Sequence, residues 1–259
     1  MAVSTKHMTA TIVERIDHAP DLWSIRVRLE EELAFKPGQY VSFGLLQSDK
    51  VLERAFSIVS SPYEDQLEFF IERVPGGALS PLLHELGVGD TVLMRKRAKG
   101  IFFIDTASGH SNHLLVATVT GIAPYVSMVR TLLRDLNEAR LQTPPRVAVL
   151  HGASHSPEFS YRVEMEAVAG EAPWLNYTGT ISRPWEDPGW RGERGRVDDV
   201  LRKYCDAFGM EPEDTTAYLC GHPGMIDNAR DILRRRGFDK ASIREENYWP
   251  GESMADVEY

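Results

Sequence analysis

Short apolar segments alternate with turn residues throughout the first hundred positions of the chain. The segments are rich in β-branched and aromatic side chains and cover residues 10–16, 22–29, 40–46, 55–60, 67–74 and 90–96. Turn signals such as Lys36-Pro37-Gly38 and Ser61-Pro62 separate them. Because regular short strands with this punctuation are typical of small antiparallel barrels, we predict such a barrel over residues 1–105.

The pattern changes after a polar connector at residues 105–112. Beyond it, apolar strand-like runs cover residues 114–119, 146–152, 176–181 and 217–221. Two segments between these runs place apolar side chains on one face at helical spacing: Tyr125, Met128, Val129, Leu132, Leu133 and Leu136 in one, and Val197, Val200, Leu201, Tyr204, Cys205 and Phe208 in the other. Strands that alternate with helices predict a parallel α/β domain, here over residues 112–249, followed by a C-terminal extension at 250–259.

Composition then narrows the classes of function. A net charge of −9 argues against general nucleic-acid binding. No stretch approaches the roughly 20 apolar residues of a membrane span, and the first residues lack the apolar run of a secretory signal, so we expect a cytoplasmic protein without membrane contact. Two cysteines are too few for a four-cysteine iron–sulfur site, and we expect no metal. Any redox chemistry must therefore come from an organic cofactor or a partner.

Two glycine-containing turns follow strands of the predicted α/β domain. Thr120-Gly121 precedes a helix that begins near Pro124, and Cys220-Gly221 precedes one that begins near Pro223. In parallel sheets, ligands bind beyond the carboxyl ends of the strands, where helix N-termini offer free N–H groups. Neither turn reads G-x-G-x-x-G, and ordinary strand–helix connections are the alternative. The residues alone thus indicate a nucleotide-binding domain.

A family resemblance goes further. Arg54-Ala55-Phe56-Ser57, followed by Pro75-Gly76-Gly77-Ala78-Leu79-Ser80, resembles the FAD-binding signature of the ferredoxin–NADP reductase superfamily. The two glycine turns resemble its nicotinamide-binding turns, and with Glu246-Asn247-Tyr248-Trp249 the chain is most similar to bacterial ferredoxin/flavodoxin–NADP reductases. The resemblance implies a six-stranded antiparallel barrel that carries FAD and a five-stranded parallel sheet that carries NADP(H).

The resemblance also implies roles on the FAD side. Arg54 pairs with the flavin diphosphate, for which a guanidinium fork is well suited. Phe56 replaces the usual tyrosine against the isoalloxazine, which keeps the ring stack and loses a hydroxyl. Ser57 lies near flavin N5. The remaining FAD residues are Ala55, Phe70, Ala78, Leu79, Ser80 and Thr120, with Tyr248 and Trp249 covering the flavin. For Phe56 and Phe70, plain barrel core is the alternative.

On the nucleotide side, Thr120 and Cys220 would lie beside the nicotinamide. Val119-Thr120-Gly121 departs from the family's Gly-Thr-Gly. The implied NADP(H) residues are Thr120, Gly121, Ala153, Ser154, Ser182, Arg183, Arg196, Cys220, His222, Pro223, Gly224 and Asn228. NADP is preferred to NAD because arginines suit the 2′-phosphate. Ser154, however, replaces one family arginine, and the loss of a charge-assisted hydrogen bond can cost about 1.5–3 kcal/mol of binding free energy. Arg162 is a candidate to compensate for it.

The C-terminal region and one basic run complete the expected site. The expected catalytic residues are Ser57, Cys220 and Glu246, of which Glu246 is a candidate proton relay. By sequence, Glu245 is equally well placed for that relay. The extension is either a disordered tail or a gate, in which Tyr259 or the tail folds over the flavin and controls access of the nicotinamide. Acidic ferredoxins or flavodoxins would dock on Arg95, Lys96, Arg97 and Lys99, for which a solvated hairpin is the alternative.

The resemblance therefore implies a monomeric ferredoxin/flavodoxin–NADP reductase. Hydride would pass between nicotinamide C4 and flavin N5, and single electrons would pass to the small redox protein. Two other functions remain open on the same scaffold: an NAD(P)H-dependent flavin or oxygenase reductase, and a non-catalytic flavin redox sensor.

Overall fold

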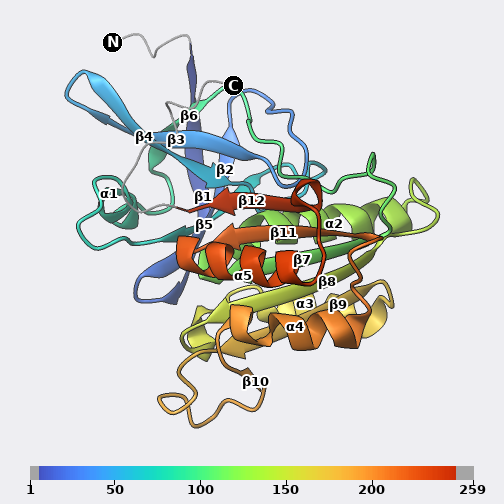
Figure 1. The fold of residues 1–259 in the computed structure, drawn as a ribbon. Helices are drawn as coiled ribbons and strands as arrows, with labels where there is room; N and C mark the ends of the chain where they lie inside the picture. Colours follow the sequence, from blue (N-terminus) through green and yellow to red (C-terminus); the bar gives the residue numbers. More distant parts are fainter. Residues whose placement is uncertain (1–5, 249–259) are drawn as a thin grey trace.

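The first half of the chain folds into a six-stranded antiparallel barrel. The structure is a computed structural model that describes residues 6–248 (Figure 1). The strands follow one another in the sheet in the order β4-β3-β6-β1-β2-β5. An isolated bridge between Ile58 and Phe69 joins the end of β4 to β5, which closes the barrel. The elements are β1 (His7–Ala19), β2 (Leu22–Leu29), β3 (Tyr40–Gln47), β4 (Lys50–Ser57), β5 (Leu67–Glu72), the short helix α1 (Ser80–His84) and β6 (Thr91–Arg95).

The second half forms a parallel sheet with the order β10-β9-β8-β7-β11-β12. Its elements are β7 (Asn112–Thr118), η1 (Val119–Ile122), α2 (Ala123–Asn137), β8 (Arg146–Ala153), η2 (Ser156–Glu158), α3 (Arg162–Glu171), β9 (Leu175–Ile181), β10 (Glu193–Arg194), α4 (Val197–Phe208), β11 (Thr215–Gly221), α5 (Pro223–Arg235), η3 (Lys240–Ser242) and β12 (Ile243–Asn247). The parallel α/β prediction is confirmed. The sheet has six strands rather than the five expected, because the two-residue β10 pairs with β9 at one edge.

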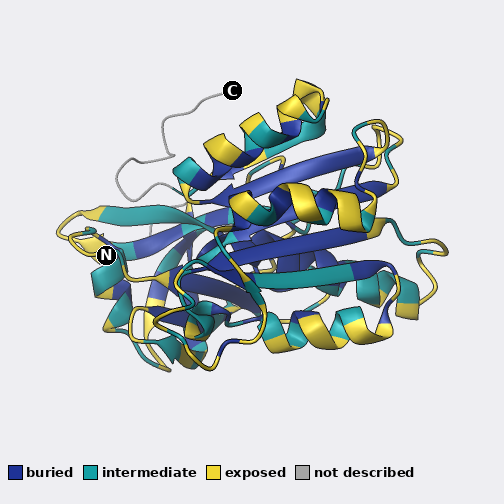
Figure 2. Cartoon of the chain, turned by 60° about the horizontal axis from the view of Figure 1, so that its bottom comes forward, coloured by how far each residue is buried: buried dark blue, intermediate teal, exposed yellow. Residues whose placement is uncertain are grey.

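Helices cover both faces of this sheet. One apolar cluster joins α2 and α3 to alternate strand residues such as Leu115, Val147 and Val149. A second cluster joins α4 and α5 to the intervening residues, among them Leu114 and Val116. The strands are therefore buried on both sides, and the helices expose only their outer faces, as Figure 2 shows. The two helical faces predicted from the sequence thus pack on the sheet, although several of their residues are only partly buried.

The two halves share a core and an ion-pair network. Phe70 and Phe102 of the first half lie in the same apolar cluster as Tyr125 of α2. Arg130 of α2 donates to the buried Glu68 of β5 at 2.7 Å. These contacts fix the barrel against the parallel sheet. The domain limits at 105 and 112 remain our division of the chain, in which β6 ends at Arg95 and β7 begins at Asn112.

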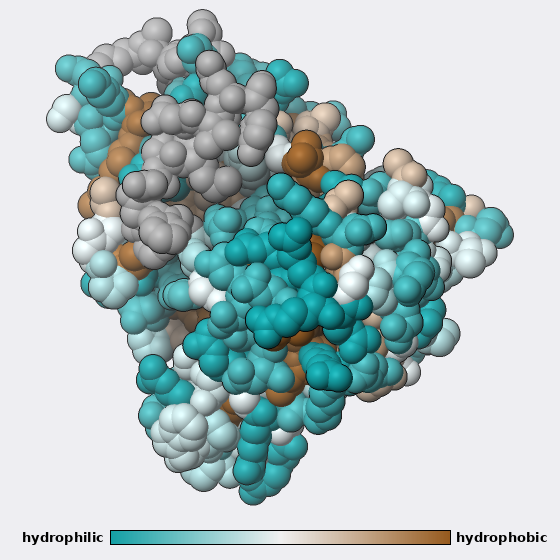
Figure 3. All heavy atoms as spheres, viewed as in Figure 1, coloured by the Kyte–Doolittle hydropathy of each residue, from teal (hydrophilic) through white to brown (hydrophobic). Residues whose placement is uncertain are grey.

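The described residues include no helix that is long and apolar enough to cross a membrane. Hydrophilic residues cover most of the described part of the face in Figure 3, and the apolar patches there are small.

Candidate functional site

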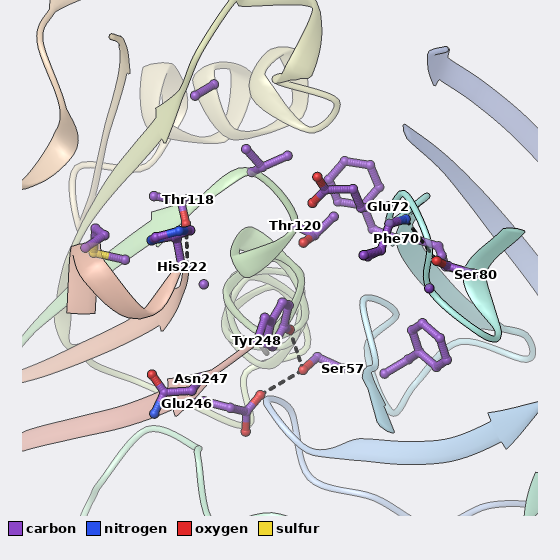
Figure 4. A pocket seen from close by; sticks show the side chains of 18 of the residues that line it. Ser57, Phe70, Glu72, Ser80, Thr118, Thr120, His222, Glu246, Asn247 and Tyr248 are labelled. Carbon is purple, nitrogen blue, oxygen red and sulfur yellow. Dashed lines mark hydrogen bonds between the residues drawn. The ribbon is translucent and has the colours of Figure 1, made fainter. Parts of the chain in front are cut away.

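A cavity of about 850 Å³ lies between the barrel and the carboxyl ends of the parallel strands. Both halves of the chain contribute to its wall (Figure 4). From the barrel side, the sequence-predicted residues that line it are Arg54, Ala55, Phe56, Ser57, Phe70, Ala78, Leu79 and Ser80. From the other side they are Thr120, Ala153, Ser154, Ser182, Arg196, His222, Glu246 and Tyr248. One continuous cavity thus joins the residues expected at FAD to those expected at the nucleotide.

The aromatic residues on the barrel side serve both the core and the cavity wall. The ring of Phe56 packs on Phe43 with centroids 4.4 Å apart, and Phe56 also lines the cavity. Phe70 is buried, packs edge-on against Tyr161 at 5.3 Å and likewise reaches the wall. Each ring thus packs in the apolar core and also lines the cavity, and its contact with a flavin stays a prediction.

The turn before α1 forms another part of the wall. Gly76 has a φ of 74°, in the left-handed region that suits glycine. The Ser80 hydroxyl accepts a hydrogen bond from the Val74 amide at 2.9 Å, which ties the start of α1 back to the end of β5. Ala78, Leu79 and Ser80 are held at the cavity in this way. Such a turn suits contact with a phosphate-bearing ligand because its backbone approaches the cavity closely.

A hydrogen-bonded chain of three side chains lies at the centre of the wall. The Tyr248 hydroxyl donates to Ser57 Oγ at 2.6 Å, and Ser57 Oγ donates to Glu246 Oε1 at 2.9 Å, as the dashed lines in Figure 4 show. Glu246 is only 8% exposed. Burial raises the pKa of its carboxyl to about 7, against the opposing effect of the Ser57 hydrogen bond. Glu245 instead pairs with Arg230 at 3.0 Å and does not line the cavity.

The first glycine turn adopts an unusual backbone. Val119, which stands where the family has glycine, has a φ of 42°, so a β-branched residue occupies the left-handed region. Thr120 follows it, is nearly buried, and lines the cavity. Gly121 does not reach the wall: a Cβ there would lie 2.3 Å from the Cys220 carbonyl oxygen. Valine therefore adopts at this position a backbone conformation that glycine takes without strain.

The second glycine turn places its residues differently from expectation. Cys220 is fully buried in the cluster with Tyr125 and does not line the cavity, and burial raises the pKa of its thiol well above the ordinary range. His222 does line it, and its backbone N–H donates to Thr118 Oγ1 at 2.8 Å. Pro223 and Gly224 begin α5 behind this turn without reaching the wall.

The end of the cavity near Ser154 and Arg196 offers few positively charged side chains to a ligand. Arg196 lines it but lies 3.3 Å from the buried Asp198 carboxylate, which also accepts from Asn228 at 2.9 Å. The Ser154 backbone N–H donates to Glu158 at 2.9 Å. Arg183 is exposed and outside the wall. The sequence interpretation missed Asp198, because the pair Asp198-Asp199 matches no motif.

Arg162, the candidate to replace the family arginine at the Ser154 position, lies away from the cavity. Its guanidinium pairs with Glu166 at 2.7 Å and lies over the Trp190 ring at 4.5 Å. Trp249 and the extension 250–259, including the gate suggested for Tyr259, lie outside the described residues.

A smaller cavity of about 390 Å³ adjoins the first, with Tyr40, Arg54 and Ala55 in both walls. The basic run Arg95, Lys96, Arg97 and Lys99 lines it. Arg95 pairs with Glu53 and Lys96 with Glu31. Arg97 and Lys99 are exposed, and neither forms an ion pair with any described carboxylate.

Comparisons with known proteins agree with this two-part site. Family models match the chain over residues 9–101, as an oxidoreductase FAD-binding domain, and over residues 115–231, as an oxidoreductase NAD-binding domain. The chain is 33% identical over 220 residues to ferredoxin–NADP reductase B of Sorangium cellulosum, covering 83% of this chain and 85% of that protein. It is 30% identical over 246 residues to a phenol 2-monooxygenase reductase component of Pseudomonas sp. strain CF600, covering 93% of this chain and 65% of that protein.

Solved structures share the fold. A ferredoxin NADP⁺ reductase from Neisseria gonorrhoeae with bound FAD and NADP superposes with a TM-score of 0.80 at 24% identity, over 95% of this chain and all of that one. A cytochrome P450 reductase from Amycolatopsis superposes with a TM-score of 0.77 at 25% identity, over 95% of this chain and 71% of that one. From its paired FAD-binding and NAD-binding domains and its extensive match to a curated reductase, we conclude that the chain belongs to the ferredoxin–NADP reductase family of flavoprotein oxidoreductases.

Proposed function

We propose that the chain transfers electrons between NADP(H) and a small redox protein, ferredoxin or flavodoxin, through FAD. The observation that carries this proposal is the single cavity whose wall joins the Arg54–Ser57 segment to the Thr120 and His222 turns. When bound, FAD supplies hydride exchange with the nicotinamide and one-electron exchange with the partner. The family membership supports the chemistry, and the relatives named as ferredoxin–NADP reductases support the partner.

The residues present fit FAD. Arg54 lines the cavity with its guanidinium Nη1 donating to the Glu53 carbonyl at 2.8 Å, which leaves further N–H groups for a diphosphate. Phe56 offers a ring at the wall, and the turn at Gly76 brings backbone N–H groups close. We assign the flavin ring to the region of Phe56 and Ser57, and the diphosphate to Arg54 and the start of α1.

Glu246 is the proton-handling group in this proposal. Its carboxyl has a pKa of about 7, so it changes protonation near neutral pH. It is linked to Ser57 Oγ, which in turn is linked to the Tyr248 hydroxyl. We therefore expect Glu246 to hold or release a proton at Ser57, on the part of the wall to which the flavin ring is assigned. Cys220 acts from behind this wall through packing, since its thiol lies in the buried cluster.

For the nucleotide, we propose NADP(H) with a modest preference over NAD(H). Arg196 supports the 2′-phosphate from the cavity wall, and Arg183 from outside it. Two residues oppose a strong preference. Asp198 partly neutralises Arg196, to which it is hydrogen-bonded, and Ser154 carries no charge. A modest rather than a strong preference for NADP(H) follows from this mixed set of groups.

The partner would dock beside the flavin region on the cavity that the basic run lines. Complementary charge mainly raises the association rate and makes it depend on salt. Because Arg95 and Lys96 already pair with carboxylates, we assign the docking role chiefly to Arg97 and Lys99. Replacing both by glutamate should lower the second-order rate of ferredoxin reduction roughly tenfold at low ionic strength and flatten its salt dependence.

The exposed Arg235 of α5 offers a matched control. Arg235→Glu reverses a charge on the other domain and should leave the rate nearly unchanged. Equal losses in the two proteins would refute docking at Arg97 and Lys99.

A second function, a reductase for a separate oxygenase, is favoured by the similarity to the phenol 2-monooxygenase reductase component and to the toluate 1,2-dioxygenase electron transfer component of Pseudomonas putida. Steady turnover with an isolated acceptor separates the candidates. Purified protein should pass electrons from NADPH to ferredoxin or flavodoxin. Turnover only with an oxygenase component would favour the second function, and no turnover with any acceptor would favour a redox sensor.

A further inference from the structure

The turn that presents Thr120 to the cavity is conformationally strained. Val119 has a φ of 42° and is one of three non-glycine residues with positive φ among the described ones. A β-branched side chain makes this region especially unfavourable, so surrounding contacts must hold it. Apolar contacts are one source, since Val119 packs against the cluster of Ala153, Phe159 and Trp190.

A buried histidine supplies a polar contact to the same residue. His151 lies on β8, paired with Ala117 of β7, and is completely buried. Its Nε2 lies 2.9 Å from the Val119 carbonyl oxygen, and its Nδ1 lies 3.1 Å from the Tyr177 hydroxyl. The ring also packs against Phe159 in a T-shaped arrangement, with centroids 4.9 Å apart. The imidazole is thus held from three sides.

The direction of these hydrogen bonds follows from the groups involved. A carbonyl oxygen only accepts, so Nε2 must carry the hydrogen and donate to Val119. Burial lowers the pKa of His151 to about 4, so the ring is neutral at neutral pH and Nδ1 is free to accept from the Tyr177 hydroxyl. The network therefore selects a single tautomer, the one that binds the turn.

We propose that His151 is a positioning residue whose Nε2–H bond holds Val119 in the left-handed conformation and thereby keeps Thr120 at the cavity wall. Thr120 follows Val119 directly, so rotation about the Val119 backbone would move it. Thr120 lies on the wall between Tyr248 and Phe70 in Figure 4. The consequence for catalysis rests on the function proposed above, whereas the conformational role does not.

The conformational role is tested by crystal structures of the purified holoprotein variants. His151→Leu removes both hydrogen bonds and fills the buried position with an apolar side chain, whereas Tyr177→Phe removes only the bond at Nδ1. We expect Val119 to leave the left-handed region in the first variant and to keep it in the second. If Val119 retains its φ in His151→Leu, the proposal is wrong, whatever the enzyme's activity.

The catalytic consequence is tested by a double-mutant cycle on the rate of flavin reduction by NADPH. Glycine adopts positive φ freely, so Val119→Gly removes the need for the imidazole. His151→Leu should slow reduction roughly tenfold in the original chain and much less in the Val119→Gly background, a coupling typical of contacting residues.

An equal loss in both backgrounds would indicate a general structural role and overturn the proposal. Urea unfolding of all four proteins checks that each is folded under the assay conditions. If even the unaltered protein is not reduced by nucleotide, the proposed function fails, and the structural comparison still decides the role of His151.

Discussion

The buried carboxyl of Glu246 should make the folded protein less stable as pH rises towards neutrality. Its pKa is about 7 in the fold, against 4.5 for an ordinary glutamate. Between these values the unfolded chain gives up the proton while the folded protein keeps it, so the unfolded state binds fewer protons and the free energy of unfolding falls as pH rises. Below about pH 4.5 the effect vanishes, and above about pH 7 it is complete.

The magnitude follows from the interval between the two pKa values. At 1.36 kcal/mol per pH unit, the interval corresponds to about 3 kcal/mol of lost stability above neutral pH. Glu246→Gln removes the titration and keeps an amide oxygen that accepts from Ser57 Oγ. The variant should match the original protein at low pH and exceed its stability by about 3 kcal/mol near pH 8.

Urea unfolding of the flavin-free proteins over this pH range measures the difference directly, without a contribution from cofactor binding. Other groups titrate equally in both proteins and cancel. Glu245→Gln is the matched control, because Glu245 is exposed and paired with Arg230. The reasoning is refuted if the stability difference between Glu246→Gln and the original protein stays constant with pH.

Two further changes test the nucleotide end and the glycine turn. Ser154→Arg places a cation at the cavity wall and should improve the binding of NADPH relative to that of NADH roughly tenfold. The dissociation constants of the two nucleotides measure this ratio. An unchanged ratio would show that the 2′-phosphate lies elsewhere. Gly121→Ala places a methyl group 2.3 Å from the Cys220 carbonyl oxygen and should lower the free energy of unfolding in urea by about 1–3 kcal/mol. Gly170→Ala in α3, where the added methyl group meets no other atom, is the control and should cost no stability. Equal stabilities of the two variants would contradict the close approach of the two turns.

The two sheets could be predicted because the apolar pattern changes period where the fold changes class. Short punctuated strands marked the barrel, and strands alternating with helices marked the parallel sheet. The apolar pattern did not predict the two edge strands of the parallel sheet, β10 and β12. β10 has only two residues, and β12 reads Ile-Arg-Glu-Glu-Asn, a polar sequence on which no apolar pattern can form. Their places depend on pairing with neighbours that are distant in sequence.

The site could be predicted as a set of motifs and only in part as geometry. Strand β11 is buried at every position, so no alternation reveals which face Cys220 occupies, and the thiol lies in the core. The Ser57–Glu246 hydrogen bond joins residues 189 positions apart, and only the fold distinguishes Glu246 from Glu245. The backbone conformation of Val119 is the feature least predictable from the sequence. Valine disfavours the left-handed region that the turn adopts there.

The central claim is that one cavity brings flavin and nicotinamide together. Anaerobic mixing of the purified flavin-loaded protein with NADPH, and separately with NADH, tests it most directly. We expect rapid bleaching of the flavin absorption with both nucleotides and a modest preference for NADPH. A protein that retains no FAD, or whose bound FAD neither nucleotide reduces, would contradict the account.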